Sequence, residues 1–185
     1  MKIRNIKILL VVAAFISLFS SQALATGNPE LLPGFPVAVQ DRIQSTPAFA
    51  NLDNDPDLEI VVSVWGPQVT WNGGGKVYAF KSDGSLVPGW PITTDCMRMN
   101  MSPAVGDLDG DGSPEIIVGG DYCTTNFTKI YVWHADGTSM QGWPKEGEYG
   151  YTSMTSQAAI ADIDGDGTKE IIINFYDDSF FVGLH

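Results

Sequence analysis

The sequence predicts an all-β fold, a β-propeller built from four-stranded antiparallel blades, of which about three are present. The chain of 185 residues contains 20 Gly and 11 Pro spread along its length, which favours turns between short strands over long helices. An acidic loop followed by a β-branched run returns after 56 and then 55 residues. A repeat at this interval is typical of propeller blades, because one sheet cannot bury both of its faces alone.

The first 25 residues are predicted to be a secretory signal peptide. Lys2, Arg4 and Lys7 precede an apolar run over 8–19, and the small-x-small pattern of 23–25 follows it. The run of about 12 residues is shorter than the roughly 20 that a helix needs to cross a bilayer. We therefore expect a mature chain, 26–185, that is secreted or at the cell surface and has no membrane span.

The charge balance argues against a nucleic-acid partner. The chain has 10 Lys and Arg against 22 Asp and Glu, a formal net charge of -12, whereas phosphate binding needs clustered cations. A hydrophobic content of 44% also excludes a disordered acidic tail. Twelve of the 22 acidic residues lie in the repeated loops, so the loops hold the main part of the charge.

The first two strands of each repeat flank its acidic loop. The first is short and rich in small residues, as expected where strands converge near a propeller axis, and the second is β-branched, as expected for a buried strand. The first strands are expected at 47–50, 103–106 and 158–161, and the second strands at 59–62, 115–118 and 170–173.

The rest of each repeat supplies a third strand, an Asp-Gly turn and a Gly-aromatic-Pro motif. Trp90 and Trp143 of this motif are expected to act as wedges between blades. The third strands are expected at 76–80, 129–133 and 180–182, and a fourth strand of an earlier blade at 31–36. The predicted units are about 31–91, 92–144 and 145–185, the last one incomplete.

These motifs resemble the FG-GAP or VCBS repeat family, the calcium-binding propeller blades also found in integrin alpha chains. The resemblance is carried by the second loop and strand, 107–118, together with Tyr131-Val132-Trp133 and Gly142-Trp143-Pro144. It covers essentially the whole mature chain and indicates a bacterial-type secreted protein. It implies a seven-bladed propeller used for adhesion, for ligand binding, or as an appendage of a secreted enzyme.

The spacing of carboxylates in the loops predicts Ca²⁺ sites. Asp107, Asp109 and Asp111 alternate with other residues, and the Gly residues of the loop let the chain curl so that all three point inward. An all-oxygen shell suits Ca²⁺ better than Zn²⁺, and crowded carboxylates repel one another without a cation. The predicted ligands are Asp107, Asp109, Asp111, Ser113 and Glu115 in the second loop, and Asp162, Asp164, Asp166, Thr168 and Glu170 in the third.

The first loop departs from this pattern and is expected to be a weaker site. Asn51 replaces the first Asp, and Pro56, whose φ is fixed near -65°, stands where the other loops have Gly. Solvated acidic turns are the alternative interpretation of all three loops. The ligands predicted here are Asn51, Asp53, Asp55, Asp57 and Glu59.

The two cysteines and the two histidines are the remaining candidates for a structural or catalytic role. An exported chain favours a disulfide between Cys96 and Cys123 within the second unit, with two buried free thiols as the alternative. Neither His134 nor His185 lies near a nucleophile motif. We therefore expect no enzymatic activity, and we expect His134 to be a surface turn residue.

The predicted function is a secreted Ca²⁺-binding propeller module for adhesion or ligand binding, in which the ion is structural and the ligand is an extracellular protein or glycan. The alternative is a non-catalytic, carbohydrate-binding portion of a larger secreted polysaccharide hydrolase or lyase. Three blades are fewer than the four to eight of a closed propeller. Further blades of a longer chain, or a second copy of this one, are therefore expected to complete the ring.

Overall fold

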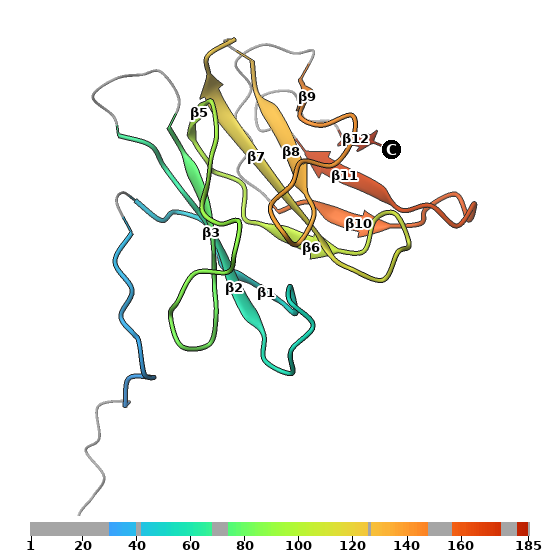
Figure 1. Ribbon diagram of the computed structural model, residues 1–185. Helices are drawn as coiled ribbons and strands as arrows, with labels where there is room; N and C mark the ends of the chain where they lie inside the picture. Colours follow the sequence, from blue (N-terminus) through green and yellow to red (C-terminus); the bar gives the residue numbers. More distant parts are fainter. Residues whose placement is uncertain are drawn as a thin grey trace, which may run out of the picture. The chain divides into compact units, whose positions relative to one another are not determined.

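The computed structural model describes residues 30–39, 42–67, 74–125, 127–147, 157–174 and 181–184. These residues form twelve β-strands in three antiparallel sheets (Figure 1), which confirms the predicted all-β class. The chain divides into two units, 1–32 and 33–185, and all three sheets belong to the second. The predicted signal peptide lies outside the described residues. Within the part described, no helix could cross a membrane.

The first sheet has the four strands that the repeat predicts. They are β1 (Ala48–Ala50), β2 (Glu59–Val64), β3 (Lys76–Phe80) and β4 (Ile92–Thr93), hydrogen-bonded in that order. The 51–58 loop joins β1 to β2, as expected. The acidic loop of each repeat therefore lies between its first and second strands.

The second sheet has five strands, so the expectation of four strands in every unit is wrong here. They are β5 (Cys96–Arg98), β6 (Ala104–Gly106), β7 (Glu115–Cys123), β8 (Lys129–Trp133) and β9 (Lys145–Glu146). The additional strand arises because β7 has nine residues, whereas β2 has six. Ala104 of β6 pairs with Ile117 near the start of β7, and Arg98 of β5 pairs with Asp121 near its end. The extra length would otherwise leave unpaired backbone groups at the sheet edge.

The third sheet contains β10 (Ala159–Ala161), β11 (Glu170–Asn174) and β12 (Phe181–Leu184). The first strands of the three repeats are neighbours, because β6 contacts both β1 and β10. Small side chains permit this approach: a Cβ added at Gly106 would lie 3.1 Å from Cδ1 of Ile160. The prediction that these small-residue strands converge is confirmed for the described residues.

Residues 31–36 form no strand, so the fourth strand expected there is wrong. Gly34 has a φ of +82°, and a Cβ at this position would lie 1.7 Å from the carbonyl oxygen of Asp83. Gly89 repeats this approach, since its Cβ would lie 2.0 Å from the carbonyl oxygen of Asp136. The Gly-aromatic-Pro motif is therefore a docking loop against the Asp-Gly turn of the following repeat, and β4 and β9 begin only after it.

Alternating side chains bury both faces of the second sheet. Ile116 and Val118 of β7 belong to a core shared with the first sheet, whereas Ile117 belongs to a core shared with the third, as the two-residue period of a strand requires. Trp90 packs edge-on against Trp133 of the second sheet, with ring centroids 6.1 Å apart. The predicted wedge role of Trp90 is confirmed by this contact, and Trp143 packs against the core shared with the third sheet.

A disulfide joins Cys96 to Cys123 and fastens β5 to the end of β7, as the sequence predicted. Asp95, next to it, accepts hydrogen bonds from Nζ of Lys129 (2.7 Å), Oγ1 of Thr124 (2.9 Å) and the hydroxyl of Tyr131. Desolvation acts to raise the pKa of Asp95, but these hydrogen bonds outweigh it and hold the pKa below its ordinary value of 3.8. The carboxylate is therefore the ionised centre of a polar cluster beside the disulfide.

Candidate metal centre

The loop between β6 and β7 is wrapped around its own carboxylates. Asp107 accepts a hydrogen bond from the backbone N–H of Gly110 on Oδ1 (2.7 Å) and from that of Gly112 on Oδ2 (3.2 Å). Both glycines have positive φ, +78° and +91°, which an L side chain adopts only with strain. Asp109 and Asp111 each accept from the N–H two residues further on, at 3.2 and 2.7 Å. The carboxylates are thus held in fixed orientations by the backbone.

The loop between β10 and β11 repeats this geometry almost bond for bond. Asp162 accepts from Gly165 (2.7 Å) and Gly167 (3.0 Å). Asp164 and Asp166 again accept from the N–H two residues on, at 3.1 and 2.7 Å. The two loops, which have nearly the same sequence, therefore form the same cage of oxygen atoms.

A buried glutamate closes each loop from the start of the second strand. Glu59, Glu115 and Glu170 are 0%, 0% and 2% exposed, and burying a carboxylate is unfavourable unless hydrogen bonds or a cation compensate. One oxygen of each is compensated by a backbone N–H at the beginning of the loop. The three donors are Leu52 (2.6 Å), Leu108 (2.8 Å) and Ile163 (2.9 Å).

The structure brings most of the predicted ligands together in groups whose ligand atoms lie within 4.8 Å of one another. In the described part of the chain, Asp57 and Asp166 lie outside these groups, and Asp57 instead accepts a hydrogen bond from Oγ of Ser82 (2.8 Å). Carboxylates this close repel one another unless a cation lies between them. The groups are Asp53, Asp55 and Glu59; Asp107, Asp109 and Asp111; Asp109, Glu115 and His134; and Asp162, Asp164 and Glu170.

The donor set fits Ca²⁺. The groups in the second and third loops consist mainly of carboxylates. Ca²⁺ prefers hard oxygen ligands of this kind and binds 6–8 of them. Ser113 and Thr168, predicted as backbone-carbonyl ligands, lie at the ends of these loops and donate their N–H groups to Asp111 and Asp166. These hydrogen bonds use the N–H groups of the two residues, whereas the prediction concerns their carbonyl oxygens.

His134 makes a contact that sequence reasoning missed. It begins the turn that ends at Gly137, as expected, but Nδ1 of its partly exposed ring also lies 3.1 Å from Oε1 of the buried Glu115. The available signal was its position immediately after the third strand, level with the glutamate that begins the second strand.

Lys81 occupies the corresponding position in the first repeat and was also missed. Its ammonium group bonds to Oδ2 of Asp53 and lies 4.0 Å from Oδ2 of Asp55. The hydrogen bond from Lys81 is the main reason that the pKa of Asp53 is lowered, and the same bond raises the pKa of Lys81. The first loop thus has a cation of its own.

The first loop also differs in its backbone. Asn54 takes the positive φ, +63°, that Gly takes in the other loops, and its N–H donates to Oδ1 of Asn51 (2.7 Å). Pro56 has no N–H to donate to the other side-chain atom of Asn51. Instead, the Asn51 amide donates to the carbonyl oxygen of Asp55. The predicted departure in how this loop closes is confirmed.

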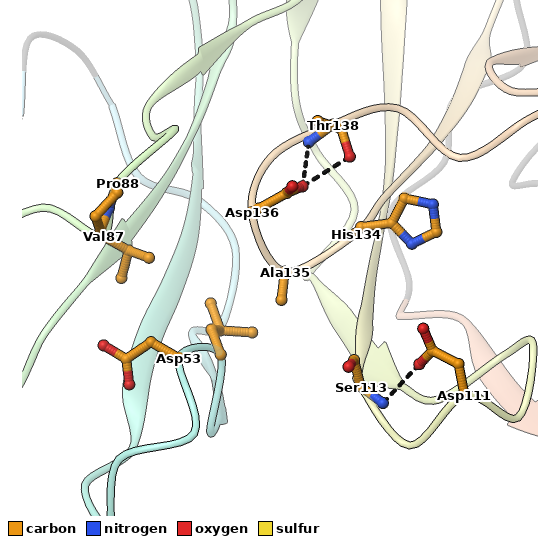
Figure 2. A pocket seen from close by; sticks show the side chains of 10 residues that line it. Asp53, Val87, Pro88, Asp111, Ser113, His134, Ala135, Asp136 and Thr138 are labelled. Atoms are coloured by element: carbon orange, nitrogen blue, oxygen red, sulfur yellow. Dashed lines mark hydrogen bonds between the residues drawn. The ribbon is translucent and has the colours of Figure 1, made fainter.

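A pocket of about 520 Å³ lies between the first and second acidic loops (Figure 2). Asp53 lines it from the first loop, whereas Asp111 and Ser113 line it from the second. A smaller pocket of about 120 Å³, lined by Asp109 and Thr168 among others, occupies the equivalent position between the second and third loops. The acidic loops therefore border both of these pockets.

Residues 51–118 match an FG-GAP-like repeat. This match covers the first two acidic loops and the strands between them, and it confirms the resemblance found in the sequence. A comparison with curated proteins finds no significant match. Among solved structures, the chain is similar to the V. cholerae biofilm matrix protein Bap1, with a TM-score of 0.51 and 19% sequence identity. The similarity covers 84% of this chain and 28% of Bap1, so it concerns the fold of one part of that protein.

Proposed function

We propose that this chain is an extracellular FG-GAP-like repeat module whose second and third acidic loops each bind one structural Ca²⁺ ion. The observation that carries the proposal is the duplicated cage, in which Asp107 and Asp162 accept the same backbone hydrogen bonds within 0.2 Å. Each cage holds carboxylates whose oxygen atoms lie within 4.8 Å of one another, and such carboxylates repel one another unless a cation lies between them. Bound Ca²⁺ would join the first strand of a repeat to its second.

The proposed location is outside the cell. The disulfide between Cys96 and Cys123 favours an oxidising compartment, and the structural neighbour is a biofilm matrix protein. We propose a non-catalytic role in adhesion or ligand binding, with an extracellular protein or glycan as ligand and with further blades or a second copy completing the ring. A glycan and matrix-protein array, probed with and without chelator, tests the ligand class.

Calorimetry of the chelator-treated full chain tests whether the loops bind Ca²⁺. Addition of Ca²⁺ is expected to give saturable heat and a rise in melting temperature, because an ion that binds only the folded state stabilises it. Asp164→Asn should lose one equivalent of bound Ca²⁺. The matched control is Asp136→Asn, an aspartate in an exposed turn that bonds only to Thr138 among the contacts described, and it should keep full binding. Absence of heat in the unmodified chain would overturn the proposal.

A further inference from the structure

We infer that the Lys81 ammonium group takes the place of the metal ion in the first acidic loop, so that this repeat closes without Ca²⁺ while the second and third require it. This inference rests on the proposed function, because it assigns the ions to two of the three loops. It also makes Lys81 the residue that determines which loop binds metal.

The position of Lys81 follows from the register of the sheet. Ile60 of β2 pairs with Phe80, the last residue of β3, so Lys81, which follows it, lies at the level of Glu59, the glutamate that closes the loop. From there the lysine side chain reaches Asp53, to which it bonds, and comes within 4.0 Å of Asp55. Asp53, Asp55 and Glu59 are the group that would otherwise surround an ion.

An ammonium group in this place is incompatible with Ca²⁺. Both cations would need the same carboxylate oxygens, and the repulsion between charges of +1 and +2 a few ångströms apart opposes joint occupancy. The covalently attached lysine is present at a high effective concentration, since its chain is already ordered by the end of β3. The first loop therefore keeps its own cation.

The rest of the first loop is adapted to the weaker charge of an ammonium group. At the first position, Asn51 is neutral where the other loops have Asp107 and Asp162. The Asn51 amide donates a hydrogen bond to the carbonyl oxygen of Asp55, whereas Asp107 only accepts. The one carboxylate of the loop outside this group, Asp57, accepts a hydrogen bond from Oγ of Ser82. These differences reduce the negative charge around the position that Lys81 occupies.

The other loops have no such ammonium group among the described residues. In the second loop the position after the third strand is His134, which contacts Glu115 through one ring nitrogen. Lys169 approaches the second loop, but its Nζ donates to the backbone carbonyl oxygen of Asp107 (2.6 Å). The described ion pairs of lysine with loop carboxylates are the two made by Lys81.

The first loop retains one feature of an ion site. Glu59 is fully buried, and its Oε1 has no hydrogen-bond partner, while Oε2 accepts from the N–H of Leu52. A buried carboxylate oxygen without a donor is unfavourable unless a cation lies near it. Removal of the Lys81 charge should therefore leave Asp53, Asp55 and Glu59 in need of another cation, and Ca²⁺ would supply it.

The test is the number of Ca²⁺ ions bound by the chelator-treated full chain, measured by equilibrium dialysis and calorimetry with Ca²⁺ alone as the probe. The unmodified chain should bind two ions, Lys81→Met three, and Lys81→Arg, which keeps the charge, two. Lys76→Met is the matched control, because Lys76 lies at the opposite end of β3, and it should also bind two. Three ions in the unmodified chain, or two in Lys81→Met, would overturn the inference while leaving the proposed function intact.

A reciprocal variant keeps the inference testable even if Lys81→Met folds poorly. His134→Lys places an ammonium group at the equivalent position of the second loop and should reduce the number of bound ions from two to one. His134→Gln, which removes the imidazole without adding an ammonium group, should bind more Ca²⁺ ions than His134→Lys. Two ions in His134→Lys would count against the inference, and no binding by any of these chains would overturn both the inference and the proposed function.

Discussion

At the scale of single residues, the position after the third strand brings a side chain to the acidic loop in the first two repeats. This residue is Lys81 in the first repeat and His134 in the second. Lys81 contacts Asp53 of its loop, and His134 contacts the glutamate that closes its loop. The buried glutamate opposite, Glu59 or Glu115, is the same in both. We therefore expect the charge of this one side chain to set whether the loop needs a bound ion.

Asp95 carries a prediction about acid stability. Its pKa is lowered in the folded chain, so its ionised form stabilises the fold at pH values above 3.8, and this contribution is lost as the pH falls through the lower, folded value. In chelator at pH 6, Asp95→Asn should be less stable than the unmodified chain by about 1 kcal/mol, a figure reduced for solvent screening of a half-exposed carboxylate.

Urea unfolding at several pH values measures this difference. It should narrow as the pH decreases below 3.8, because Asp95 then becomes protonated, first in the unfolded chain and at lower pH in the folded chain. Lys129 and Tyr131 would lose a charged acceptor in both chains. A difference that stays constant over this range would mean that Asp95 acts through neutral hydrogen bonds alone.

At the scale of structural elements, the Gly-aromatic-Pro loops connect successive repeats, and their glycines allow a controlled comparison. Gly89 and Gly142 have nearly the same φ, +90° and +89°, so alanine costs each about 1–2 kcal/mol in backbone strain. A Cβ at Gly89 would lie 2.0 Å from the Asp136 carbonyl oxygen, whereas a Cβ at Gly142 meets nothing within 4 Å among the described atoms.

Gly89→Ala should therefore be less stable than Gly142→Ala by about 2 kcal/mol or more, because a backbone oxygen cannot move aside as a flexible side chain can. The comparison needs only chemical unfolding of the two variants beside the unmodified chain. Equal losses would show that the close approach of Gly89 to the Asp136 turn does not hold the first two sheets together.

Sequence periodicity predicted the elements that carry a strong local signal. The second strands, the acidic loops and the wedge at Trp90 were all visible because β-branched runs, alternating Asp residues and Gly-Trp-Pro recur. Strand β5 was not predicted, since its existence depends on how far β7 extends past β6. Residues 31–36 were assigned to a strand because they resemble Gly89-Trp90-Pro91, and in both places the motif proved to be a docking loop.

The candidate site also has residues that could be predicted from the sequence and residues that could not. The carboxylates were predictable from their spacing along one loop. Lys81 and His134 were not, because they reach the loop from another strand, and only the pairing of the second and third strands places them there. Contacts between strands depend on register, which a pattern of single residues does not specify.

At the scale of the whole molecule, the net charge of -12 must be accommodated in a chain whose sheets pack closely together. Screening by any salt would reduce the repulsion in a diffuse way, whereas a caged ion acts only at its loops. The two mechanisms differ in the concentration that they need. A site exposed to Ca²⁺ at 100 times its Kd adds about 2.7 kcal/mol to the free energy of unfolding. It can do so at ionic strengths at which screening is weak.

Melting temperatures in 1 mM CaCl₂ and in NaCl of the same ionic strength, about 3 mM, separate the two mechanisms, because the Debye length exceeds 30 Å in both. We expect a clear rise in CaCl₂ and almost none in NaCl. MgCl₂ should be less effective than CaCl₂, because Mg²⁺ demands a smaller, octahedral shell and gives up its water reluctantly. Equal rises in all three salts would mean that diffuse screening stabilises the sheets and that the duplicated cages hold no specific ion.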